Sequence, residues 1–342
     1  MPIPFLVPGA IAAASAAAAA VGIGSGAKAI KKNKQAKNIN AEAQSTFDKA
    51  KAATERARNK SNKSLEKLGK TKLNVLDQSM NHFVAVFDQI HNIKLKDSVG
   101  LDELSKFHLD KQDLVEIREL GSMATSVIGG LVGGAGAGAL TAFGAYGATM
   151  TFAAASTGTA IASLSGVTAT NATLAFLGGG ALAAGGGGMA LGSTILGGAV
   201  AGPAIAILGV VMNASASKNL DNAYSNKYKA EEAAGSLKVV RTLCNGISKR
   251  SDMFTSLISK LDEILIELTA QLEEIVNTRG TNFARFNETE RGIVAMSMSV
   301  AGAIKKVLDT PILTEAGELT EESKVVHAEM EKYIESIEVA DA

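Results

Sequence analysis

The chain has 342 residues, with 34 Lys and Arg against 34 Asp and Glu, no Trp and 4% aromatic residues. Its single cysteine, Cys244, excludes an internal disulfide and a thiolate metal cluster. The scarcity of proline and the Ala, Lys, Glu, Leu and Ser of the two flanks favour long helices over sheet. The balanced charge hides two opposed blocks, because residues 28–72 carry 14 basic against 4 acidic residues and residues 309–342 carry 2 against 10. Either the two blocks pair with each other or they bind separate partners, with anionic lipid a candidate for the basic block.

The amino-terminal segment, residues 1–27, is apolar, and its lysines follow the apolar stretch instead of preceding it. That order argues against a secretory signal, and the alanine content suits a helical hairpin arm or an interfacial helix. From Lys28 to about Leu95, apolar residues recur every three or four positions, which predicts one long amphipathic helix. A polar connection and a short helix complete the region of residues 28–119. The first lysines of this region are candidate contacts with an anionic lipid surface: Lys28, Lys31, Lys32 and Lys34.

Residues 120–217 contain no charged residue over 98 consecutive positions, a length that allows up to four membrane-spanning helices. Glycine and small polar residues divide this block into candidate segments near 123–140, 143–164, 173–191 and 194–213. Only the last segment, which holds Ile205 and Leu208, is strongly hydrophobic. We therefore predict a glycine-rich membrane module that is packed away in a soluble form and enters lipid when its helices associate.

Small residues four positions apart form two series in this block. One consists of Gly130, Gly134 and Gly138, and the other contains Gly180, Gly188 and Gly192. Such spacing places the glycines on one helix face and lets two helix backbones approach closely in lipid. The alternative is coincidence, since 23 of the 35 glycines lie in this block.

Residues 218–308 return to the long-helix pattern, with an apolar seam from Phe254 to Ile275, a helix end at Gly280, and a further helix from about Glu288 to Leu308. Residues 309–342 form an acidic tail with a short helix. The expected fold is all-α: an elongated antiparallel helical bundle with a long Gly/Ala-rich hydrophobic helical module. In it, residues 65–90 pack against residues 254–275.

Motifs for catalysis or cofactor binding are lacking in the sequence. The glycine-rich run before Lys28 lacks the residues of a phosphate loop, and the four histidines have no metal-ligand spacing. Residues 28–72 lack the interleaved aromatic residues that nucleic-acid binding favours. We expect no enzyme activity, no cofactor, no small-molecule substrate and no nucleic-acid partner.

Two long amphipathic helices that flank an apolar, Gly/Ala-rich segment resemble the architecture of the α-helical pore-forming toxins, such as cytolysin A and the haemolysin BL components. The resemblance implies a hydrophobic element that is packed on a helical bundle in the soluble form and inserts on membrane contact. Residues 170–180 and 309–313 also resemble stretches of uncharacterised bacterial glycine-rich proteins, which implies a bacterial or phage origin and no particular activity.

The leading hypothesis is a membrane-active protein that forms homo-oligomers, or assembles with related helical subunits, and permeabilises or perturbs a lipid bilayer as a toxin or an intracellular defence effector. It is expected to be membrane-associated and soluble before insertion; the sequence leaves open whether it is secreted. The alternative is a membrane-anchored coiled-coil scaffold that recruits a protein partner without forming a pore. A third hypothesis is a soluble helical protein that keeps the apolar block buried permanently.

Overall fold

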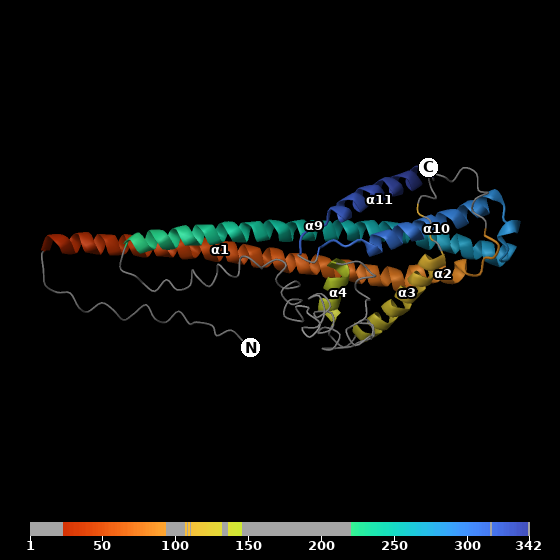
Figure 1. The fold of residues 1–342 in the computed structure, drawn as a ribbon, viewed down its shortest axis with the longest axis horizontal. Coiled ribbons are helices and arrows are strands. Elements are labelled where there is room, and N and C mark those ends of the chain that lie inside the picture. Colours follow the sequence, from red (N-terminus) through yellow and green to blue (C-terminus); the bar gives the residue numbers. More distant parts are fainter. Residues whose placement is uncertain are drawn as a thin grey trace. The chain divides into compact units, whose positions relative to one another are not determined.

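The computed structural model describes residues 23–93, 107, 109, 111–131, 136–145, 220–314 and 317–340 (Figure 1). This part of the chain is all-α, as predicted: it is 89% helical and contains no strand. Its helices, in chain order, are α1 (Ile23–Val75), the π-helix η1 (Leu76–Met80), α2 (Asn81–Phe87), α3 (Lys111–Leu131), α4 (Gly136–Ala145), α9 (Leu220–Arg279), the 3-10 helix η5 (Phe283–Arg285), α10 (Glu288–Asp309) and α11 (Glu321–Ala340).

Local signals in the sequence account for the helix ends around α9 and α10. Gly280 follows α9 with φ 84°, a left-handed conformation that glycine adopts without strain. Asn287 then begins α10 with a capping box, in which its side chain accepts from the backbone N–H of Glu290 while the Glu290 carboxylate accepts from the backbone N–H of Asn287. The predicted bounds of both helices are therefore confirmed to within two residues.

The chain divides into two compact units, which we describe separately. The first, here called the two-helix unit, comprises residues 1–55 and 202–241. In its described part, the beginning of α1 packs beside the beginning of α9, and the buried contacts are mostly alanines: Ala36, Ile39 and Ala223 in one cluster, and Ala43, Phe47, Ala230, Ala233 and Leu237 in the next. Small side chains let the two helices approach closely but bury little apolar area, so this pair gains little hydrophobic stabilisation.

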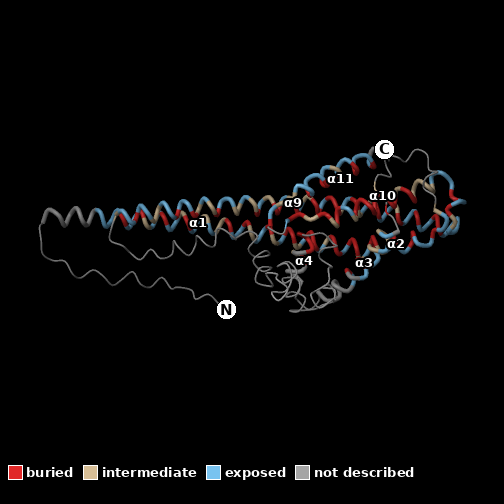
Figure 2. The backbone as a smooth tube through the Cα atoms, in the orientation of Figure 1, coloured by how far each residue is buried: buried red, intermediate tan, exposed pale blue. Residues whose placement is uncertain are grey.

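The second unit, here called the bundle unit, comprises residues 56–201 and 242–342. Its core contains the predicted apolar seam, because Phe254, Leu257, Leu261, Leu272 and Ile275 are all buried. Ile264 and Leu268 of the same seam are only partly buried. Figure 2 shows the buried positions gathered on the inner faces of α2, α9 and α10.

Within each unit, α1 and α9 run parallel, not antiparallel as we expected. In the two-helix unit, Asn40 pairs with Asn226 and, further along both helices, the Thr54 hydroxyl donates to the Leu237 carbonyl. In the bundle unit, Ser64 pairs with Ser248, and His91 forms a parallel bridge with Asn282.

Helices α3 and α4, which lie between α1 and α9 in the chain, explain why α1 and α9 run parallel in the bundle unit. Helix α3 runs antiparallel to α2 and the π-helix, since Arg118 pairs with Asp88 and Thr125 with Asp77. Helix α4 also runs antiparallel to α1. The chain has therefore already reversed its direction once, in α3 and α4, before it reaches α9. The expected antiparallel arrangement is found between chain neighbours, such as α10 and α11, where Lys306 meets Glu329 and Ser299 meets Tyr333.

The beginning of the charge-free block belongs to the bundle unit. Leu120 and Ala124 of α3, and Leu140 and Phe143 of α4, are buried. Among the described helices, none combines the length and apolar character that a membrane crossing requires. Most of the predicted membrane module lies outside the described residues.

Candidate functional site

Helix α4 docks on α1 through direct contact between the two backbones. A Cβ atom added to Gly69 of α1 would lie 1.9 Å from the carbonyl oxygen of Leu140, and one added to Gly144 of α4 would lie 2.0 Å from the carbonyl oxygen of Leu65. Real Cβ atoms do not approach oxygen so closely, so any other residue at either position must push the helices apart. The two glycines thus set the distance at which α4 lies on the bundle.

A buried lysine lies beneath the docked helix. Lys72 of α1 is completely buried, its Nζ donates a hydrogen bond to the Leu308 carbonyl oxygen over 3.1 Å, and the same Nζ lies 5.9 Å from the centre of the Phe143 ring of α4. Leu308 is in the last turn of α10, where carbonyl oxygens lack helical partners and favour a cation. Burial lowers the pKa of Lys72 to about 7, although the negative charge of Asp309 opposes this shift.

The turn between α10 and α11 holds the end of α4. The carbonyl oxygen of Ala145, the last residue of α4, accepts from the backbone N–H of Ile312 over 2.8 Å and of Leu313 over 3.1 Å. The turn is itself closed by hydrogen bonds from Thr320 to Ile312 and from Thr314 to Glu318. We call the contacts of Gly69, Gly144, Lys72, Phe143 and Ala145 the α4 dock.

A cluster of charges joins α3 to α10 in the same unit. The Nζ of Lys305 lies 3.4 Å from Asp113, 3.2 Å from Glu116 and 2.9 Å from Asp309. Burial by itself would lower the pKa of Lys305, but hydrogen bonds and charge from Asp309 and Glu116 outweigh burial and raise it. Lys305 therefore stays charged, and its ion pairs hold α3 against α10.

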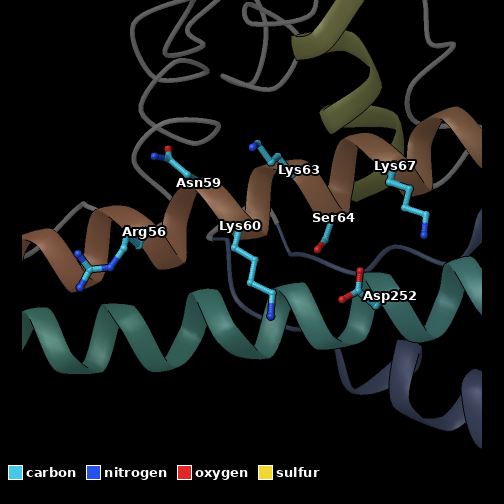
Figure 3. A pocket seen from close by; sticks show the side chains of 7 residues that line it. All are labelled: Arg56, Asn59, Lys60, Lys63, Ser64, Lys67 and Asp252. Atoms are coloured by element: carbon cyan, nitrogen blue, oxygen red, sulfur yellow. The ribbon is translucent and has the colours of Figure 1, made fainter.

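A basic hollow of about 470 Å³ opens between α1 and α9 in the bundle unit (Figure 3). Its lining residues on α1 are Arg56, Asn59, Lys60, Lys63, Ser64 and Lys67, and α9 contributes Asp252. Four cations and a single carboxylate thus line the hollow. Within the described part of the chain, none of the four cations lies within ion-pair distance of a carboxylate.

The predicted site residues are only partly within the described chain. Lys32 and Lys34 are exposed on α1, and Lys28 and Lys31 lie in the same helix. Gly130 is in α3 and Gly138 is in α4, two separate helices. The remaining predicted packing residues lie outside the described residues: Gly134, Gly180, Gly188, Gly192, Ile205 and Leu208. Their role in helix packing stays a prediction.

The α4 dock was not identified from the sequence, although two signals pointed to it. Gly69 is the only glycine between Lys28 and Leu95, which marks a position where the backbone can be approached. Lys72 continues the apolar series of Leu65, Leu68 and Leu76, so a helical wheel places a charge on the buried face. Phe143 and Gly144, by contrast, are surrounded by so many apolar and small residues that nothing distinguishes them.

Comparisons with protein-family models, with curated proteins and with solved structures found no match to this chain. Candidate metal sites are also absent from the described part, where no three His, Cys, Asp or Glu side chains form a group that could hold an ion. The α4 dock and the basic hollow are therefore the features of the described chain from which we infer function.

Proposed function

We propose that this chain is a membrane-active helical protein that stores the start of its apolar block on the bundle unit and releases it to perturb or permeabilise a lipid bilayer. The observation that carries the proposal is the α4 dock. It holds a Gly- and Ala-rich helix of the apolar block against α1 and the turn that follows α10.

Two features make the dock easy to reverse. The contact at Gly69 and Gly144 joins backbones, so the apolar area that release of α4 exposes comes mainly from Leu140 and Phe143. The dock also keeps Lys72 away from water, and releasing α4 would let this side chain regain hydration. Both features reduce the free energy that separates the docked from the released helix.

After release, the glycine-rich residues 120–217 are proposed to associate with those of further copies in the membrane, because small residues allow close helix packing in lipid. The partners in this proposal are the bilayer and other copies of the chain or related helical subunits. No catalytic step is part of the proposal.

A methyl group added at the dock tests the proposal. Gly144→Ala places a Cβ atom 2.0 Å from the Leu65 carbonyl oxygen and must displace α4. The matched control is Gly292→Ala in α10 of the same unit, where an added Cβ atom meets no atom within 4 Å. We expect faster hydrogen exchange in α4, stronger vesicle binding and more dye release for Gly144→Ala, and none of these changes for Gly292→Ala.

The outcomes separate the competing functions. Exposure of α4 without vesicle binding or dye release would refute the membrane-active function. Vesicle binding without dye release at any protein concentration would favour the membrane-anchored scaffold. One observation supports that second function: Tyr224, Tyr228 and Val239 of α9 are exposed in the two-helix unit, at spacings that place them on one helix face where a protein partner can bind.

A further inference from the structure

We propose that the basic hollow of the bundle unit binds a polyol that carries two or more phosphate groups, either as a lipid headgroup or as a soluble molecule. The proposal concerns a different site from the α4 dock and does not require that the chain permeabilises membranes.

The cations of the hollow form one row on α1. Arg56, Lys60, Lys63 and Lys67 follow one another at steps of four, three and four residues, which places them on one face of the helix. Like charges at these spacings repel each other. Since none of the four forms an ion pair in the described part, the repulsion is not relieved by a neighbouring helix. A ligand with several negative charges would relieve it.

The sequence of α9 opposite this row does not supply the missing negative charge. Lys249 and Arg250 lie beside the only acidic residue there, Asp252, and Arg250 donates to the Ser323 hydroxyl instead of to a carboxylate. Further along α9, acidic residues become frequent, as at Asp262, Glu263 and Glu267. The excess of positive charge is therefore local to the hollow.

The neutral and acidic groups of the hollow narrow the ligand chemistry. The Asn59 side chain is exposed and offers both amide donors and an acceptor. Figure 3 shows Asp252 between the side chains of Lys60 and Lys67. A carboxylate repels phosphate but accepts hydrogen bonds from hydroxyl groups, so its position among cations suits a ligand that alternates phosphates with free hydroxyls. A phosphorylated polyol, such as an inositol phosphate, has this pattern, whereas inorganic phosphate does not.

The volume of the hollow and the length of its row of cations are consistent with a phosphorylated polyol as the ligand. The volume of about 470 Å³ lies within the range of about 300–1,000 Å³ that small-molecule sites occupy. The row from Arg56 to Lys67 covers twelve residues, which is about 16 Å along a helix from the first to the last and enough for phosphates on opposite sides of one ring.

The test measures binding of two soluble probes, inositol 1,4,5-trisphosphate and inorganic pyrophosphate, to the full chain by calorimetry. The test variant is Lys60→Gln/Lys63→Gln/Lys67→Gln. Its matched control is Lys260→Gln/Lys324→Gln/Lys332→Gln, which removes the same charge from exposed positions outside the hollow. We expect the test variant to weaken trisphosphate binding by about tenfold or more, and the control by less than about threefold.

A variant of the carboxylate tests the polyol. Asp252→Ala removes both the repulsion of phosphate and the acceptor for hydroxyl groups. We therefore expect tighter binding of pyrophosphate and a smaller preference for the trisphosphate over pyrophosphate. An equal gain for both probes would refute the role of the polyol hydroxyls.

Vesicles distinguish the two sources of the ligand. Vesicles that contain phosphatidylinositol 4,5-bisphosphate are compared with phosphatidylserine vesicles of equal surface charge, and the hollow predicts a preference for the former that the test variant abolishes. Trisphosphate binding without a vesicle preference assigns the site to a soluble polyol phosphate. Absence of binding, or equal losses in the test and control variants, overturns the proposal. Dye release is a separate measurement, so either proposal can fail alone.

Discussion

Replacing Lys72 by Met should change how stability depends on pH, because this lysine is buried in the folded chain. Burial lowers its pKa from 10.5 to about 7, whereas in the unfolded chain the side chain is hydrated and keeps the ordinary value. Between these two pH values, the unfolded state binds a proton that the folded state lacks. The free energy of unfolding therefore rises with pH from about 7 to about 10.5 and is independent of this residue well below pH 7, where both states are protonated.

The magnitude follows from the size of the shift. Each pKa unit corresponds to about 1.4 kcal/mol, so a lysine with this shift weakens folding by about 4 kcal/mol at pH 7 compared with a neutral buried side chain, and by about 1 kcal/mol at pH 10. Lys72→Met keeps the length of the side chain but loses the hydrogen bond with the Leu308 carbonyl oxygen, at a cost of about 1 kcal/mol. We expect Lys72→Met to be more stable than the parent by about 3 kcal/mol at pH 7 and about equal to it at pH 10.

Urea unfolding of parent and variant at pH 7, 8.5 and 10 provides the measurement. Other titrating groups are present in both proteins, so their effects cancel in the difference between the two. A difference that stays constant across this pH range would show that Lys72 is charged and solvated in the folded state, and would refute the buried position on which the α4 dock depends.

Two further predictions concern the core and the membrane module. Leu261→Ala and Phe87→Ala should each lower the free energy of unfolding of the bundle unit by about 2–5 kcal/mol, because both side chains are buried; unchanged urea midpoints would argue against this core. Gly134→Leu should raise hydrophobicity yet abolish crosslinked oligomers and dye release, whereas Gly134→Ala should retain more of both; full activity of the Leu variant would refute glycine packing and leave the anchored scaffold as the better function.

The helices themselves could be predicted because their signals are local. Apolar residues at steps of three and four and the stop at Gly280 act within one or two turns of chain. These signals place α9 and α10 to within two residues of their observed bounds.

The direction and contacts of the helices depend on information that is not local. An apolar stripe packs equally well against a parallel or an antiparallel partner, so the sequence could not show that α1 and α9 run parallel. The absence of charge after Glu119 suits a protein core as well as lipid, and the structure buries Leu120 and Phe143 in the bundle unit. The predicted helix over residues 123–140 is likewise divided between α3 and α4.

The sequence predicts the positive charge of the basic hollow, because basic residues are in excess over residues 28–72. It does not predict that α9 is the helix that lies opposite these residues. Only the structure places Asp252 near Lys60 and Lys67. It also shows that, among the described residues, the cations of the hollow form no ion pair with a carboxylate.

The parallel direction of α1 and α9 sets an order for folding during synthesis. Ser64 and Ser248 are 184 residues apart, so their contact must wait until nearly three quarters of the chain has been made. Gly69 and Gly144 are only 75 residues apart, and both leave the ribosome before any part of α9 is translated. Closing the longer loop also costs about 0.8 kcal/mol more in chain entropy. We therefore expect α1, α3 and α4 to assemble first, so that the start of the apolar block is already covered while the remainder is still being made.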